Sequence, residues 1–117
     1  MDAETLKTLA VHAVETLKGE DVAVLDVRDR TSMTDYMVIA AGNSNRHVRS
    51  LADEVVRRAR GTEGAGKPRV EGGESSDWVL VDMGDVIVHL MLPATREFYD
   101  LERFWRDAPG EGAASTE

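Results

Sequence analysis

Cysteine is absent from this chain of 117 residues. Its absence excludes disulfide bonds and metal sites built on thiolates. The three histidines, His12, His47 and His89, fall on separate predicted elements, and no pair of them has the spacing of a metal motif. We therefore expect neither a bound metal ion nor a cofactor.

Long apolar runs are also missing. No stretch is long and apolar enough to cross a membrane, and no segment has the pattern of a signal peptide. The expectation is a soluble cytoplasmic protein that contacts no membrane. The length corresponds to one domain that can bury its own core.

Basic residues are in the minority, with 14 against 22 acidic residues and a formal net charge of −8. Binding to nucleic acid depends largely on neutralising phosphates, so this charge disfavours an RNA-binding module. A basic protein partner suits the charge better.

What the chain does contain is a predicted β-hairpin from Trp78 to Met91. Gly84 and Asp85 separate two β-branched runs, and glycine supplies the positive φ that a two-residue turn requires. Because side chains alternate along a strand, this register gives the hairpin two sides. One side is wholly apolar and is predicted to face the core: Val79, Val81, Met83, Val86, Val88 and Leu90. The other side is mixed: Trp78, Leu80, Asp82, Ile87, His89 and Met91.

The mixed side of the hairpin admits two interpretations. A helix covers it in many α/β folds, and His89 is then a hydrogen-bonded, semi-buried histidine. Alternatively, the side is open to solvent, and its tryptophan, leucine and methionine form a docking patch with an acidic rim.

Other segments complete a small α/β domain with a mixed sheet and flanking helices. Apolar periodicity predicts helices from Leu6 to Leu17, ending near Gly19, and from Val48 to Ala59, and strands from Val22 to Val27 and from Tyr36 to Ala41. We expect the Val22 to Val27 strand inside the sheet, because both of its sides are largely apolar. The arginines of the second helix, including Arg57 and Arg58, are expected on a solvated face.

The second half of the chain carries weaker signals. Residues 60–77 form a glycine-rich, flexible connection in which only Lys67 to Glu71 suits a short edge strand. Pro93 starts a helical segment, with Phe98, Leu101 and Trp105 on one face. The domain therefore spans residues 1–107, and the acidic residues 108–117 are predicted to be disordered.

A catalytic role is a weaker alternative. A nucleotide-handling enzyme, similar to a nucleotidyltransferase, would use Asp26, Asp35 and Asp82 to hold Mg²⁺. Asp82 and Asp85 are three residues apart, however, and do not share a strand face. We therefore assign no catalytic residue and no small-molecule substrate.

The start of the second helix has two interpretations of its own. Free amides there, together with Arg46 and Arg49, would attract an anion. The favoured interpretation is that Asn43 or Ser44 simply caps the helix.

Three segments together resemble the ribosomal silencing factors of the Iojap family: Thr34–Val48, Trp78–His89 and Arg96–Trp105. The resemblance implies a nucleotidyltransferase-like α/β fold without the catalytic carboxylate set. It also implies binding to the large ribosomal subunit through its protein L-fourteen, which blocks joining of the small subunit and silences translation when nutrients are scarce. Members of the family often form homodimers, and neither a cofactor nor sequence-specific nucleic-acid binding is implied.

The resemblance also implies the residues that dock. Trp78 and Tyr99 would be the anchors, Leu80 and Met91 the apolar floor, and His89 a hydrogen-bond partner, with Leu101 beside them and Asp82 and Glu102 as an acidic rim. This role and the composition of the mixed side together favour its exposure. Leu101 also suits the core, because its spacing matches that of Phe98 and Trp105.

Overall fold

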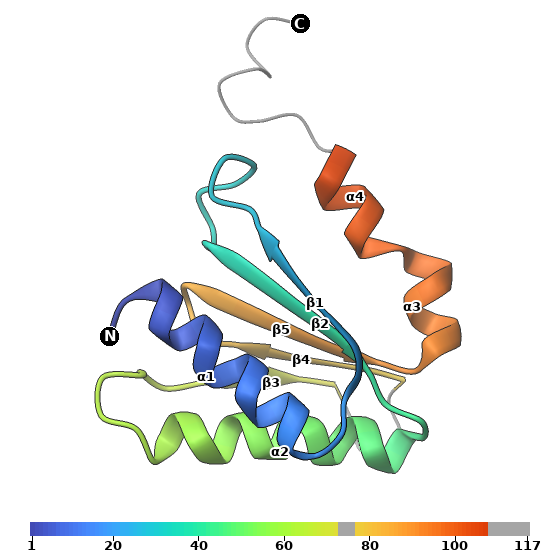
Figure 1. The fold of residues 1–117 in the computed structure, drawn as a ribbon, viewed down its shortest axis with the longest axis horizontal. Helices are drawn as coiled ribbons and strands as arrows, with labels where there is room; N and C mark the ends of the chain where they lie inside the picture. The colour runs from blue at the N-terminus through green and yellow to red at the C-terminus, as the bar shows by residue number, and fades with distance from the viewer. Residues whose placement is uncertain (73–76, 108–117) are drawn as a thin grey trace, which may run out of the picture.

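Five strands form one mixed sheet in the order β1-β2-β5-β4-β3 in the computed structural model, which describes residues 1–72 and 77–107 (Figure 1). The strands are β1 (Glu20–Asp26), β2 (Tyr36–Ala41), β3 (Arg69–Glu71), β4 (Trp78–Asp82) and β5 (Val86–Met91). Only β2 and β5 are parallel, and the other neighbouring pairs are antiparallel. The predicted α/β class with a small mixed sheet is confirmed. The predicted disordered tail and the middle of the predicted flexible connection lie outside the described residues.

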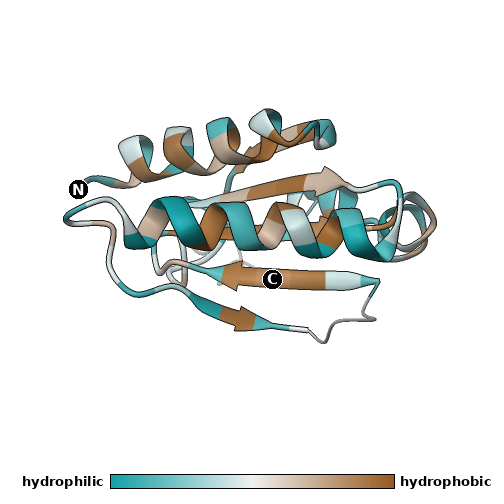
Figure 2. Cartoon of the chain, turned by 90° about the horizontal axis from the view of Figure 1, so that it is seen from below, coloured by the Kyte–Doolittle hydropathy of each residue, from teal (hydrophilic) through white to brown (hydrophobic). Residues whose placement is uncertain are grey.

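Two long helices, α1 (Ala3–Thr16) and α2 (Asn45–Arg60), cover one face of the sheet (Figure 1). Asp2 caps α1 by accepting a hydrogen bond from the Thr5 backbone N–H at 2.8 Å, and the hydroxyl of Ser44 caps α2 in the same way. This arrangement supports the capping interpretation of the α2 start. The apolar stripes of both helices pack on the apolar side of the sheet. The strands are largely coloured as hydrophobic in Figure 2.

The hairpin of β4 and β5 has the predicted register. Trp78 lies opposite Met91, Leu80 opposite His89 and Asp82 opposite Ile87. Gly84 turns the chain with a φ of +82°, a conformation that an L side chain rarely adopts. The predicted apolar side is buried against α1 and α2 as expected, with Val81, Val86 and Val88 wholly inaccessible to solvent.

The prediction that the first strand lies inside the sheet is wrong. β1 is an edge strand, paired with β2 alone, and several of its side chains are exposed. Its apolar residues differ in their surroundings: Val22 packs against the core, Leu25 lines a small cavity with Trp105, and Val24 is exposed. The other edge is β3, as predicted for Lys67 to Glu71.

The helical segment that starts at Pro93 is broken in two. Asp100 adopts a left-handed conformation, with φ +48° and ψ +54°, and separates α3 (Pro93–Tyr99) from α4 (Leu101–Asp107). The predicted common face of Phe98, Leu101 and Trp105 is therefore wrong: Leu101 and Trp105 are half-buried, whereas Phe98 is 79% exposed. Both short helices lie on the side of the sheet opposite α1 and α2 (Figure 1).

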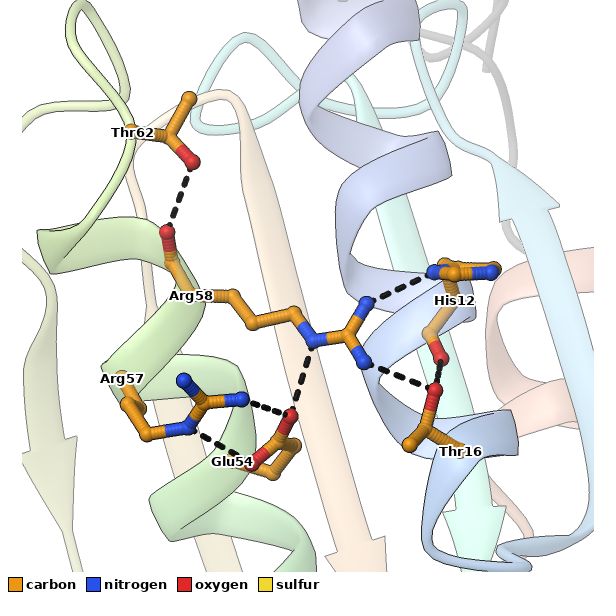
Figure 3. A network of polar contacts seen from close by, with 6 residues as sticks. All are labelled: His12, Thr16, Glu54, Arg57, Arg58 and Thr62. Carbon is orange, nitrogen blue, oxygen red and sulfur yellow. Dashed lines mark hydrogen bonds and ion pairs between the residues drawn. The ribbon is translucent and has the colours of Figure 1, made fainter.

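A polar network joins α1 to α2 (Figure 3). Arg58 reaches from α2 and donates hydrogen bonds to Glu54 at 2.8 Å, to Nδ1 of His12 at 2.6 Å and to the hydroxyl of Thr16 at 2.8 Å. The prediction of a solvated Arg58 is wrong, because two of its three partners, His12 and Thr16, lie on α1 and hold its side chain between the helices. Arg57, in contrast, is exposed and pairs with Glu54 alone among the residues that the structure describes.

These contacts predict different roles for two neighbouring arginines. Arg58→Met should lower the free energy of unfolding by about 1–2 kcal/mol, because it removes charge-assisted hydrogen bonds between two helices. Arg57→Met should leave it nearly unchanged, because exposed ion pairs contribute little. Chemical denaturation of both variants measures their free energies of unfolding. Equal losses in the two variants would contradict the different roles of the two arginines.

The same network predicts a dependence on pH. Hydrogen bonds from Arg57 and Arg58 lower the pKa of Glu54 to about 2, from 4.5. Since the folded-state pKa lies below the unfolded one, the stabilisation by ionised Glu54 is complete above pH 4.5 and is lost as the pH falls toward 2. The stability difference between the wild type and Glu54→Gln should shrink over this range. A constant difference, or the same pH profile in an Arg57→Met/Arg58→Met background, would disprove the assignment.

Candidate docking surface

Trp78 is the centre of the surface that the sequence predicted. Its ring lies 4.9 Å from the Tyr99 ring, so it joins the hairpin to α3. Its indole N–H donates a hydrogen bond to Nδ1 of His89 at 3.0 Å. Trp78 itself is half-buried, which leaves part of the ring at the surface. The two predicted anchors, Trp78 and Tyr99, are thus brought together as a contacting pair, with their ring planes tilted by 51°.

His89 lies beneath this pair and is only 5% exposed. Because the indole can only donate, Nδ1 of His89 accepts, and the neutral ring carries its proton on Nε2. This Nε2 is buried, and no atom of the described residues forms a hydrogen bond with it. Burial lowers the pKa of His89 to about 4, so the ring is uncharged at neutral pH.

The expected exposure of the whole mixed side is therefore wrong for two of its residues. His89 is buried and Met91 is wholly inaccessible, whereas Trp78 and Leu80 are half-buried. This side of the sheet is partly covered, as the first interpretation of the mixed side proposed: Trp78 lies against His89, and α3 contacts Trp78 through Tyr99. Met91 lies under the surface as part of its floor.

The segment after the hairpin supplies the outer part of the surface. Tyr99 is 53% exposed at the end of α3, and Leu101 is half-buried at the start of α4. Leu101 thus belongs neither wholly to the core nor wholly to the exposed patch. Phe98, which the sequence had placed with the core, lies 5.0 Å from the Tyr99 ring in an edge-on contact and is exposed.

Both predicted rim acids already have arginine partners. Glu102 accepts a hydrogen bond from Arg96 at 2.8 Å across the bend between α3 and α4, and this bond lowers the pKa of Glu102. Asp82 accepts from the Gly84 backbone N–H at 2.8 Å and pairs with Arg69 at 3.3 Å. These contacts hold the carboxylates in place, and the arginines partly neutralise their negative charge.

The carboxylates of the enzymatic alternative are not brought together. Asp26 lies opposite Tyr36, on the side of the sheet that faces α1 and α2, whereas Asp82 lies opposite Ile87 on the other side. Three strand spacings, about 14 Å, separate the two strands. Asp26 is held by Arg28 at 2.6 Å. Asp35 lies just before β2.

The described residues contain neither a metal-binding cluster nor a membrane-spanning helix. No group of three or more histidine and acidic side chains there is arranged to hold a metal ion. Of the helices in residues 1–72 and 77–107, none has the length and apolar character needed to cross a membrane.

Comparison with known sequences identifies close relatives. A family model described as "Ribosomal silencing factor during starvation" matches residues 1–117. The ribosomal silencing factor RsfS of Chromobacterium violaceum is 44% identical over 107 residues, covering 90% of this chain and 85% of the relative. RsfS of Bacillus subtilis is 35% identical over 109 residues, and the alignment covers 93% of this chain and 92% of that relative. A mouse protein named "Mitochondrial assembly of ribosomal large subunit protein 1" is 38% identical, but the alignment covers only 39% of its length.

Comparison with solved structures agrees with the sequence relationships. A crystal structure from Chromobacterium violaceum has a TM-score of 0.85 at 43% identity, covering 90% of this chain and 87% of the other. A structure from Bacillus halodurans has a TM-score of 0.76 at 37% identity, and the match covers 87% of this chain and 94% of the other. The expected likeness to nucleotidyltransferases is not tested by these structures and stays a prediction. Fold, sequence and family model agree, and the chain belongs to the RsfS family of ribosomal silencing factors.

Proposed function

We propose that this chain binds the large ribosomal subunit through its protein L-fourteen and prevents the small subunit from joining. The observation that carries the proposal is the contact between the rings of Trp78 and Tyr99, a pair that remains partly exposed beside Leu80 on the sheet face. Family membership supplies the ribosomal context. The large-subunit role named for the mouse relative agrees with the choice of subunit.

The proposed mechanism is steric and needs no chemical step. Trp78 is held by its hydrogen bond to His89 and by its contact with Tyr99, so little conformational freedom is lost on docking. Rigid aromatic side chains of this kind commonly dominate the free energy of binding at interfaces. Asp82 and Glu102 lie at the rim, where they favour a basic partner. A bound chain would occupy the space that the small subunit needs.

The proposed setting is translational repression in the cytoplasm when nutrients are limiting. The family description, which names silencing during starvation, supports this setting. In this proposal the docking residues act through contact alone, and no catalytic residue is assigned.

A central anchor should dominate binding. Trp78→Ala should weaken the affinity for purified large subunits by about 2 kcal/mol or more, because it removes the ring that links the hairpin to α3. Co-sedimentation of the chain with separated subunits measures the affinity and also shows whether the bound chain prevents joining.

Two variants control this experiment. Trp78→Phe keeps an aromatic ring against Tyr99 but loses the donor to His89, so it should bind between the wild type and Trp78→Ala. Arg57→Ala changes an exposed side chain on the opposite side of the sheet and should bind normally. A folded Trp78→Ala chain with wild-type affinity would show that the docking surface is wrongly assigned.

We also propose that the chain forms homodimers through the same surface around Trp78 and Tyr99. Dimerisation and ribosome binding would then compete. Raising the chain concentration should reduce the fraction of monomer able to bind, and Trp78→Ala should shift the dimer to monomer in analytical ultracentrifugation. A dimer that binds large subunits without dissociating would contradict a shared surface.

A further inference from the structure

Two exposed aromatic side chains remain outside the proposed docking surface. Phe98 is 79% exposed and Phe104 is 62% exposed, one on each of the two short helices. A cleft of about 620 Å³ lies at the bend between these helices, and both rings line it together with Tyr99. Solvent-exposed aromatics grouped around a cleft are typical of sites that bind another molecule.

Both exposed rings are held in place by a neighbouring ring. Phe98 meets Tyr99 edge-on at 5.0 Å, and Phe104 meets Trp105 edge-on at 5.2 Å. Tyr99 in turn contacts Trp78, and Trp105 is half-buried, so each pair is anchored to the rest of the domain. The left-handed Asp100 fixes the angle between the helices. The cleft is thus a formed feature of the fold, and its rings lose little freedom on binding.

The charged residues that line the cleft favour a basic partner. Its lining includes three acids, Glu97, Asp100 and Asp107, against one cation, Arg103. Arg103 pairs with Asp107 at 3.7 Å, which leaves an excess of negative charge. A segment with an apolar side chain flanked by lysine or arginine would complement this lining. A second copy of this chain, which the proposed homodimer seats on Trp78 and Tyr99, fits the cleft itself less well, because each copy carries a formal net charge of −8.

The cleft is continuous with the proposed docking surface, because Tyr99 belongs to both. A partner seated on Trp78 and Tyr99 therefore reaches the cleft directly. We propose that the cleft between α3 and α4 receives a basic segment of the protein that docks on Trp78, with Phe98 and Phe104 contacting an apolar side chain of that segment. This inference rests on the proposed function and extends its contact surface.

The test titrates purified large ribosomal subunits with the full chain and measures the affinity at several salt concentrations. Phe98→Ala/Phe104→Ala should weaken binding about tenfold or more, as expected for anchors in a cleft. Glu97→Gln should lower the association rate severalfold and flatten its dependence on salt, because it removes one attractive charge. Both variants change exposed side chains, and thermal unfolding checks that they remain folded.

Met33→Ala is the matched control, because Met33 is 79% exposed, like Phe98, but lies in the loop between β1 and β2. It should bind as the wild type does. If the wild type binds and the cleft variants bind like Met33→Ala, the inference is overturned while the proposed function stands. If the wild type itself fails to bind large subunits, both are overturned. If Phe98→Ala/Phe104→Ala instead dissociates a homodimer and leaves subunit binding unchanged, the cleft receives a second copy, and the inference is wrong.

Discussion

The parallel pairing of β2 and β5 is the constraint on which the rest of the structure depends. It places two apolar strands at the centre of the sheet, with neighbours on both edges, so both faces of these strands need cover. The long helices α1 and α2 cover one face of these two strands. On the other face, His89 and Met91 are buried, whereas Trp78, which α3 contacts through Tyr99, is only half-buried, as is Leu80. The candidate surface is therefore the part of this sheet face that stays accessible to solvent beside α3 and α4.

This arrangement explains how a small acidic domain can present a defined aromatic surface. The exposed rings are fixed from below, because Trp78 bonds to the buried His89, and from the side, because Tyr99 and Trp78 are in contact. The bend at Asp100 turns the two short helices so that aromatic side chains face solvent on both of them. Acids around these rings give the surface a sign of charge that suits a basic partner.

Local features could be predicted from the sequence, whereas tertiary ones could not. The hairpin register followed from Gly84 and from the alternation of apolar residues, both of which act over a few positions. The edge position of β1 depends on the strand order, which no local pattern encodes. The break at Asp100 was missed because most aspartates are not left-handed, although aspartate is one of the few residues other than glycine that adopt this conformation. The exposure of Phe98 was missed with the break, and the burial of His89 and Met91 corresponds to the interpretation of the mixed side that the sequence did not favour.

The central claim is that the face carrying Trp78 and Tyr99 is the one that meets the ribosome. The most direct measurement is an electron cryo-microscopy structure of the chain bound to the large ribosomal subunit. The account predicts that Trp78, Leu80 and Tyr99 lie against protein L-fourteen, with α1 and α2 turned away from it and the chain occupying the path of the small subunit. A complex in which α1 and α2 form the contact, or in which the chain leaves that path open, would contradict it.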